Sequence, residues 1–113
     1  MKDRLILFER GGKQDEDVIE IKLLKDGESV FRELIMIKIR VTAAQRGEIN
    51  SIADIFRAKI VDVQEESMII ELTGTQSKLE GFMNLLKGYE ILELARTGIT
   101  GLSRGCEDVT YIG

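Results

Sequence analysis

Residues that could carry chemistry are few in this sequence, and the missing types exclude several classes of enzyme. The chain contains no histidine, which is the commonest general base and the commonest transition-metal ligand in proteins. Its single cysteine, Cys106, can form neither an intrachain disulfide nor a cluster of thiolate ligands. A Ser-His-Asp or Cys-His arrangement is therefore impossible within this chain. We expect no catalytic residue, no metal site and no bound cofactor.

The remaining polar groups have simple structural interpretations beside functional ones. Glu65 and Glu66 lie in an expected turn, and nothing indicates a pocket that would raise the pKa of one carboxyl for acid–base work. The glycine-punctuated string at 97–105 lacks the Lys and the following helix of a phosphate-binding loop. Arg57 and Lys59 lie at the junction of an expected helix and the strand after it, where the helix dipole favours cations, and contact with a partner protein is the alternative.

Composition indicates one soluble domain with at most a short extension. The chain has 113 residues, of which 43% are hydrophobic and 32% are charged. A net charge of -4 without a Lys/Arg cluster argues against nucleic acid as a partner. No apolar run approaches the roughly 20 residues that cross a bilayer, and the apolar stretch near the N-terminus is too short for a secretory signal. We therefore expect a cytoplasmic protein.

The elements that must position these residues are clearest from Arg32 onward. Residues 33–41 (ELIMIKIRV) alternate with period two and are rich in β-branched residues, which predicts a strand. Thr42 and Gln45 have capping-box spacing, so a helix should run from about 43 to 57. Its buried stripe recurs at three- and four-residue spacing, and consists of Ile49, Ile52, Ala53 and Phe56.

The second half of the chain predicts two more strands, a second helix and a final strand. Two strands, 58–63 and 68–73, are joined by a short polar turn that favours a hairpin. Thr75 is a plausible N-cap for a second helix, which should end near Lys87-Gly88 with Gly88 at the C′ position. Its apolar stripe is Leu79, Phe82, Met83 and Leu86. A final strand is expected at 91–96, followed by a glycine-rich tail.

This order, β-α-β-β-α-β, predicts an α+β fold of the ferredoxin-like type. A four-stranded antiparallel sheet would carry both helices on one face. We assign residues 32–113 to this domain and residues 1–31 to an N-terminal extension. Two strand-like runs in the extension, 4–8 and 18–24, are separated by a flexible polar loop (GGKQDED) and predict a β-hairpin or an addition to the main sheet.

The sheet face away from the helices is expected to be mostly apolar. If the alternation holds, it carries Leu34, Met36, Ile60, Ile69, Ile91 and Ala95, mixed with Lys38, Arg40, Asp62, Glu71 and Glu93. Soluble monomers rarely expose large contiguous apolar patches, so we expect association here, as a homodimer or a larger homo-oligomer. A partly solvated face and a cover formed by the N-terminal strand pair are the two alternatives.

Five segments between Arg32 and Gly105 carry a resemblance to one known family. They are RELIMIKI at 32–39, DIFRAKIVDV at 54–63, IELTGT at 70–75, ELARTG at 93–98 and SRG at 103–105. They occur in the family's order and at its spacing. On these residues the sequence resembles the C-terminal domain of the small, regulatory subunit of acetolactate synthase (acetohydroxyacid synthase).

The resemblance implies a non-catalytic subunit that associates with the thiamine-diphosphate-dependent catalytic (large) subunit in branched-chain amino-acid biosynthesis. In this family an N-terminal ACT domain binds the feedback inhibitor, usually valine, at a dimer interface. Nothing in residues 1–31 resembles the ACT domain, so no inhibitor-binding residue carries over. Ile99, Gly101 and Ser103 also depart from the family pattern. We expect a truncated remnant, a separately encoded module or one excised domain.

Six residues are candidates for contact with a partner: Leu34, Met36, Ile69, Arg57, Arg96 and Thr97. The first three belong to the expected apolar face. Arg96 and Thr97 belong to the ELARTG segment, where the resemblance suggests a partner contact or a small-anion site. The simpler interpretation is that Arg96 pairs with a nearby Glu and that Gly98 permits a turn or a bulge.

A second function remains open beside the regulatory subunit. The expected fold and the apolar face also fit a stand-alone, ACT-like module that binds a small amino acid between protomers. An enzyme on this fold is a weaker third, because no nucleophile arrangement is present.

Overall fold

The computed structural model describes residues 4–11 and 17–106. The chain falls into two compact units, one formed by Met1–Phe31 with Thr100–Gly113 and the other by Arg32–Ile99. No helix among the described residues is long and apolar enough to cross a membrane. The division of the chain into an extension at 1–31 and a domain at 32–113 stays a prediction.

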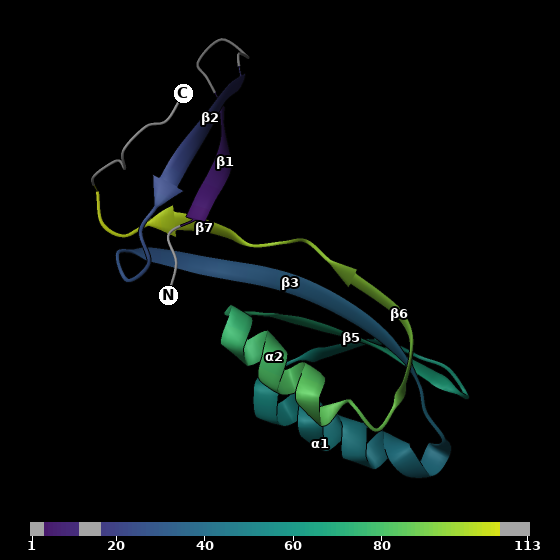
Figure 1. The fold of residues 1–113 in the computed structure, drawn as a ribbon. Coiled ribbons are helices and arrows are strands. Elements are labelled where there is room, and N and C mark those ends of the chain that lie inside the picture. Colours follow the sequence, from purple (N-terminus) through teal and green to yellow (C-terminus); the bar gives the residue numbers. More distant parts are fainter. Residues whose placement is uncertain (1–3, 12–16, 107–113) are drawn as a thin grey trace. The chain divides into compact units, whose positions relative to one another are not determined.

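The unit Arg32–Ile99 has the expected α+β architecture. Its elements are β3 (Ser29–Arg40, which begins in the other unit), a 3₁₀ turn η1 (Ala43–Gln45), α1 (Arg46–Phe56), β4 (Lys59–Val63), β5 (Ser67–Gly74), α2 (Gln76–Leu85) and β6 (Glu90–Arg96). The strands are antiparallel in the order β4-β5-β3-β6, and both helices lie on one face of them (Figure 1). This order confirms the ferredoxin-like prediction.

The core lies between the sheet and the two helices. Alternate residues of β3 are almost fully buried, as the period-two pattern predicts, because they face the helices. The stripes predicted for both helices pack against them, with Phe56 and Phe82 in edge-to-face contact at 5.4 Å between ring centroids. The fully buried cluster is Ile35, Ile37, Ile39, Val41, Ile49, Met68, Ile70, Leu72, Leu79, Phe82 and Leu86.

The caps predicted at the N-terminal ends of the two helices are present, but the one predicted at the C-terminal end of the second helix is not. Thr42 N–H donates to the Gln45 side chain at 2.9 Å, and Thr75 caps α2 by accepting from Lys78 N–H at 3.3 Å. The prediction for Gly88 is wrong: α2 ends at Leu85, with Leu86 as its C-cap, and the φ of Gly88 is not positive. The left-handed residue that ends a helix is instead Arg57, after α1.

Two β-bulges correct the predicted sheet faces. The register of β4 against β5 shifts between Ile60 and Asp62, so Ile60 lies opposite the buried Ile70 and packs against the core. The register of β3 against β6 shifts at Lys38/Ile39, so Ile91 lies opposite the buried Ile39. Each bulge inserts one residue and reverses the alternation beyond it. Ile60 and Ile91 therefore belong to the helix side of the sheet and not to its outer face.

The other unit contains β1 (Arg4–Gly11), which pairs antiparallel with β2 (Asp17–Leu24). The polar loop predicted between them lies largely outside the described residues. A strand that the sequence did not indicate, β7 (Thr100–Ser103), pairs with β3. Beyond β7, Arg104 N–H donates to the Glu28 carbonyl at 2.9 Å, so the glycine-rich tail is ordered by backbone pairing.

Candidate partner-binding surfaces

The outer face of the sheet, opposite the helices, holds three of the six candidates, as predicted. Leu34, Met36 and Ile69 are partly accessible there, while their β3 and β5 neighbours are buried. Across the strands, Met36 lies between Glu71 and Ala95. With Ile60 and Ile91 removed from this face, its apolar residues are interspersed with charge and do not form the continuous patch that was expected.

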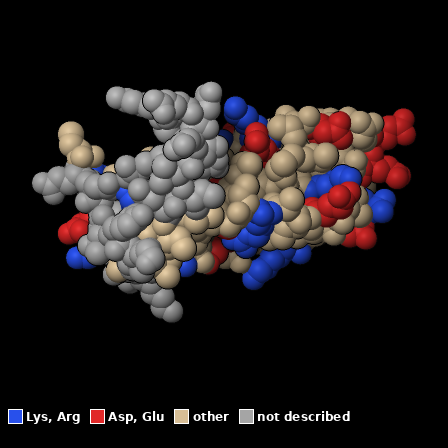
Figure 2. All heavy atoms as spheres, turned by 90° about the horizontal axis from the view of Figure 1, so that it is seen from above, with Lys and Arg blue, Asp and Glu red and all other residues tan. Residues whose placement is uncertain are grey.

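Ion pairs neutralise much of that charge. The ammonium of Lys38 bonds to Glu93, and Arg40 donates to Glu90 at 2.6 Å. Figure 2 looks onto this side of the molecule. It shows Lys and Arg (blue) next to Asp and Glu (red), with uncharged residues (tan) between them. The outer face is therefore a mixed surface, in which apolar side chains alternate with neutralised pairs.

Arg96 and Thr97 bond within the sheet. Arg96 donates to Glu33 of β3, which confirms the simpler interpretation of this arginine. Leu34 N–H donates to Thr97 Oγ1 at 3.1 Å, and Thr97 N–H donates to the Leu34 carbonyl at 3.0 Å. Gly98 has φ +83°, a conformation that favours glycine, but residues 97–99 form neither a turn nor a bend, and the strands on both sides of them pair with β3. These bonds give both candidates a structural role.

Arg57 lies in a different setting. It is exposed and adopts the left-handed conformation, φ 59°, at the end of α1. Neither Arg57 nor Lys59, two residues later, forms an ion pair with any of the described residues. Of the candidate cations, Arg57 is thus the one whose charge is available to a partner.

Exposed apolar residues that the sequence did not indicate lie close to Arg57 in the chain. Ile55, near the end of α1, is 72% exposed, and Val61 and Val63 on the edge strand β4 are also exposed. The exposure of Ile55 could have been predicted from the sequence, because this residue does not belong to the buried stripe of its helix. We call Ile55, Arg57, Lys59, Val61 and Val63 the α1/β4 surface.

A groove of about 200 Å³ opens between α2 and β6. Its lining is mostly apolar, with the polar side chains Glu80, Asn84 and Arg96, and also includes Ile35, Leu79, Met83 and Leu94. The cation in this lining is Arg96, which already bonds to Glu33. A carboxylate ligand in the groove would have to compete with that bond.

The described residues contain no group of three or more Asp, Glu or Cys placed to hold a metal ion. Tyr89, after α2, donates from its hydroxyl to Glu48 of α1. That hydrogen bond, with smaller contributions from burial and from the charge of Glu48, raises the pKa of Tyr89 above its ordinary value. The pair ties the two helices together, so its evident role is structural.

Comparison with known proteins gives one consistent result. A family model described as the small subunit of acetolactate synthase matches residues 32–105. The chain is 46% identical over 89 residues to the acetolactate synthase small subunit of Mycolicibacterium smegmatis, covering 79% of this chain and 52% of that protein. It is 41% identical over 91 residues to that of Bacillus subtilis, covering 80% and 53%.

A solved structure is similar over most of the chain. The acetolactate synthase small subunit from Thermotoga maritima superposes with a TM-score of 0.70 at 29% identity, covering 93% of this chain and 83% of that one. By contrast, the chain spans about half the length of the curated relatives it matches.

Proposed function

Since the chain belongs to the family of acetolactate synthase small subunits, we propose that it is a non-catalytic regulatory or assembly subunit that binds the catalytic subunit of acetolactate synthase in branched-chain amino-acid biosynthesis. The observation that carries this proposal is the coincidence of the family match, 32–105, with the compact unit Arg32–Ile99. The subunit would act in the cytoplasm and would form a homodimer or a larger homo-oligomer.

The residue types support a non-catalytic role. The sequence has no histidine, and its one cysteine, Cys106, is exposed without a histidine to activate it. The groove beside α2 has a bonded arginine as its cation. Regulation by association needs no histidine, no activated cysteine and no free cation in a groove, because it requires only complementary surfaces.

The α1/β4 surface and the outer face are the two surfaces best suited to the catalytic subunit. The first combines exposed apolar side chains with Arg57 and Lys59, which have no ion-pair partner in the described part of the chain, so it would fit an apolar surface bordered by carboxylates. The second offers Leu34, Met36 and Ile69 between neutralised charge pairs. Arg96 and Thr97 would support the second surface through their bonds to β3.

The test is acetolactate formation by the catalytic subunit of the same organism, with and without this chain, and with and without valine. Activation with co-elution of the two proteins is expected. Valine sensitivity of the complex is not expected, because residues 1–31 offer no inhibitor-binding segment. Absence of both activation and co-elution would contradict the proposal.

A matched pair of variants locates the contact. Arg57→Glu should weaken binding of the catalytic subunit at least about tenfold, which is about 1.4 kcal/mol, because it reverses a charge that has no ion-pair partner among the described residues. Lys87→Glu is the control, since Lys87 is an exposed cation that follows the other helix. Equal effects of the two variants would show that only net charge matters.

The sensing alternative, a module that binds a small amino acid between protomers, stays a prediction. The engagement of Arg96 by Glu33 disfavours the groove as a carboxylate site. A thermal-shift panel of amino acids decides it, since a ligand that binds the folded state must raise the melting temperature.

A further inference from the structure

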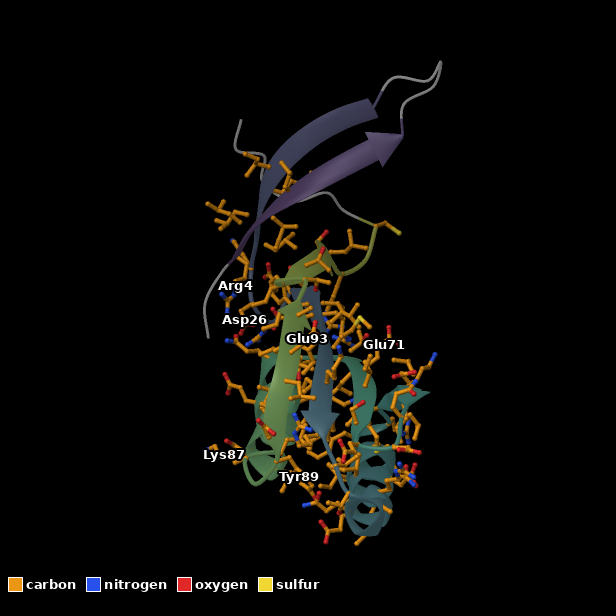
Figure 3. All side chains as sticks on the ribbon, turned by 90° about the vertical axis from the view of Figure 1, so that its right-hand side faces the viewer. Arg4, Asp26, Glu71, Lys87, Tyr89 and Glu93 are labelled. Atoms are coloured by element: carbon orange, nitrogen blue, oxygen red, sulfur yellow. The ribbon has the colours of Figure 1, made fainter. Side chains whose placement is uncertain are left out.

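β6 is an edge of the sheet with a partner on one side. Among the described strands it pairs with β3, and every residue from Glu90 to Arg96 is exposed. In Figure 3, β6 carries Glu93 at the margin of the sheet with β3 beside it, while Glu71 lies on the far side of β3. Exposed edges of this kind are templates for pairing with another strand.

The backbone groups that are available for such pairing follow from the β3–β6 hydrogen bonds. Thr97 N–H donates to the Leu34 carbonyl, so Thr97 points its backbone groups toward β3. Successive residues of a strand point these groups to opposite sides. Ala95 and Glu93 therefore also face β3, while Leu94 and Arg96 present their N–H and C=O groups to the open side.

The side chains on the helix side of β6 are incompletely covered. Leu94 lies opposite the buried Ile37, yet it is 44% exposed, because the groove beside α2 leaves it open. Leu92, which has no partner in β3 at the bulge, is also exposed. One more strand along this edge would cover both leucines.

The charges of β6 do not protect its edge. Natural edges are usually blocked by free charges, proline, bulges or short length. Each charged residue of β6 instead has a partner of opposite charge in β3: Glu90 with Arg40, Glu93 with Lys38 and Arg96 with Glu33. β6 can therefore approach another strand without bringing an unpaired charge to it.

The opposite edge of the sheet differs in length and in charge, although both edge strands are bulged. β4 has five residues against seven in β6, and its charged residues, Lys59 and Asp62, have no ion-pair partner within the described chain. Its features are those that discourage strand addition. The contrast singles out β6 among the two edges.

We propose that β6 pairs antiparallel with β6 of a second copy of this chain, about a twofold axis at Leu94. This proposal specifies the homo-oligomer named under the proposed function and is independent of binding to the catalytic subunit. Leu94 faces Leu94 of the copy, and the two residues exchange the N–H and C=O groups that point outward. Arg96 lies opposite Leu92 of the copy, and Glu93 lies opposite Ala95. The two sheets join into one.

Charge and length select this register. An axis at Glu93 would place two glutamates directly opposite each other, which is destabilising in a sheet. An axis at Ala95 would leave Leu92 outside the paired stretch. The axis at Leu94 pairs residues 92–96 of both copies and brings the two Leu94 side chains together beside the grooves that they line.

The experiment introduces a charged side chain at Leu94, the residue on the proposed twofold axis, in the full chain. Leu94→Lys and Leu94→Glu should each weaken self-association at least about tenfold, measured by sedimentation equilibrium, because like charges then face each other. An equimolar mixture of the two variants should recover dimers, since Lys then faces Glu. Val61→Lys on β4, a comparably exposed edge position, is the control and should leave association unchanged.

Disulfide cross-linking provides a second test if the charged variants fold poorly. In a Cys106→Ser background, Leu94→Cys treated with a mild thiol oxidant such as oxidised glutathione should form an intermolecular disulfide, because hydrogen-bonded pairs have Cα atoms about 5.5 Å apart, within the range for a disulfide. Val61→Cys should not. A monomeric wild-type chain, dimers that persist in Leu94→Lys, or disruption by Met36→Lys alone would each overturn the proposal, the last by favouring the outer face. Failure of the catalytic-subunit assay would leave it untouched.

Discussion

Arg96 on β6 donates to Glu33 on β3, and the carboxylate that it meets is only 6% exposed. The arginine itself is 44% exposed. The ion pair therefore joins a buried carboxylate to a guanidinium at the surface. Removal of the surface member leaves a buried carboxylate without its partner, which is the costly way to break an ion pair. Arg96 is thus a stability residue before it is a contact residue.

Arg96→Ala should lower the free energy of unfolding by about 2 kcal/mol, because Glu33 then loses its charge-assisted hydrogen bond. Urea denaturation measures the loss. Glu33→Gln/Arg96→Gln should recover part of it, since no charge is then buried. Lys38→Ala, which leaves behind the 70% exposed carboxylate of Glu93, is the control and should cost about 0.5 kcal/mol. Equal costs would mean that burial of Glu33 is unimportant.

Gly101→Ala should destabilise the chain by about 2 kcal/mol, because the added methyl group has no space. A Cβ at this position would lie 2.6 Å from the Val30 carbonyl oxygen and 2.6 Å from Phe31. Gly47→Ala in α1 is the matched control, where a Cβ meets nothing within 4 Å. That change should stabilise by about 0.5–1 kcal/mol through helix propensity. Thermal unfolding distinguishes the two signs, and a stabilising Gly101→Ala would contradict the prediction.

This clash also gives a physical reason for one departure from the family pattern. Gly101 is one of the positions at which the sequence departs from the family that it resembles, and in this chain the close approach of Val30 requires glycine. The sequence alone could not show the reason, since β7 has four residues and no hydrophobic period. Its strand conformation depends on its partner β3, which lies far away in the sequence.

The elements and the core could be predicted because their periodicity is strong. The side of the sheet on which each strand residue lies could be predicted only up to the nearest β-bulge, because the alternation changes phase there. In both Lys59–Val63 and Glu90–Arg96, apolar residues are adjacent to one another, so either phase of the alternation fits the pattern. Ile60 and Ile91 were therefore assigned to the wrong face, whereas Leu34, Met36 and Ile69, on strand segments without a bulge, were assigned correctly.

Among the candidate site residues, the sequence could not separate paired from unpaired cations. Arg57 and Arg96 both follow apolar segments, and only the register of β3 against β6 brings Glu33 near Arg96. The left-handed backbone of Arg57 was equally hidden, because glycine is the residue that signals this conformation.

Tyr89→Phe should lower stability by less than about 1 kcal/mol at neutral pH, since the lost hydrogen bond to Glu48 is near the surface. Because the folded-state pKa of Tyr89 is raised above 10.0, the wild-type advantage is fully present below pH 10.0 and is lost as the pH rises through the raised pKa. Urea unfolding of both proteins from neutral to alkaline pH measures the difference. A constant difference above pH 10.0 would contradict the assignment.

Arg57→Gly separates folding from partner binding at one position. Glycine adopts φ 59° without the steric cost that arginine bears, so the variant should be more stable by about 1 kcal/mol in urea denaturation. Arg57→Ala is the control, because it removes the same charge and keeps the strain. Both variants should weaken binding of the catalytic subunit by the same factor in a pull-down titration. Equal stabilities would exclude strain at Arg57, and unchanged binding in both variants would remove Arg57 from the α1/β4 surface as a contact.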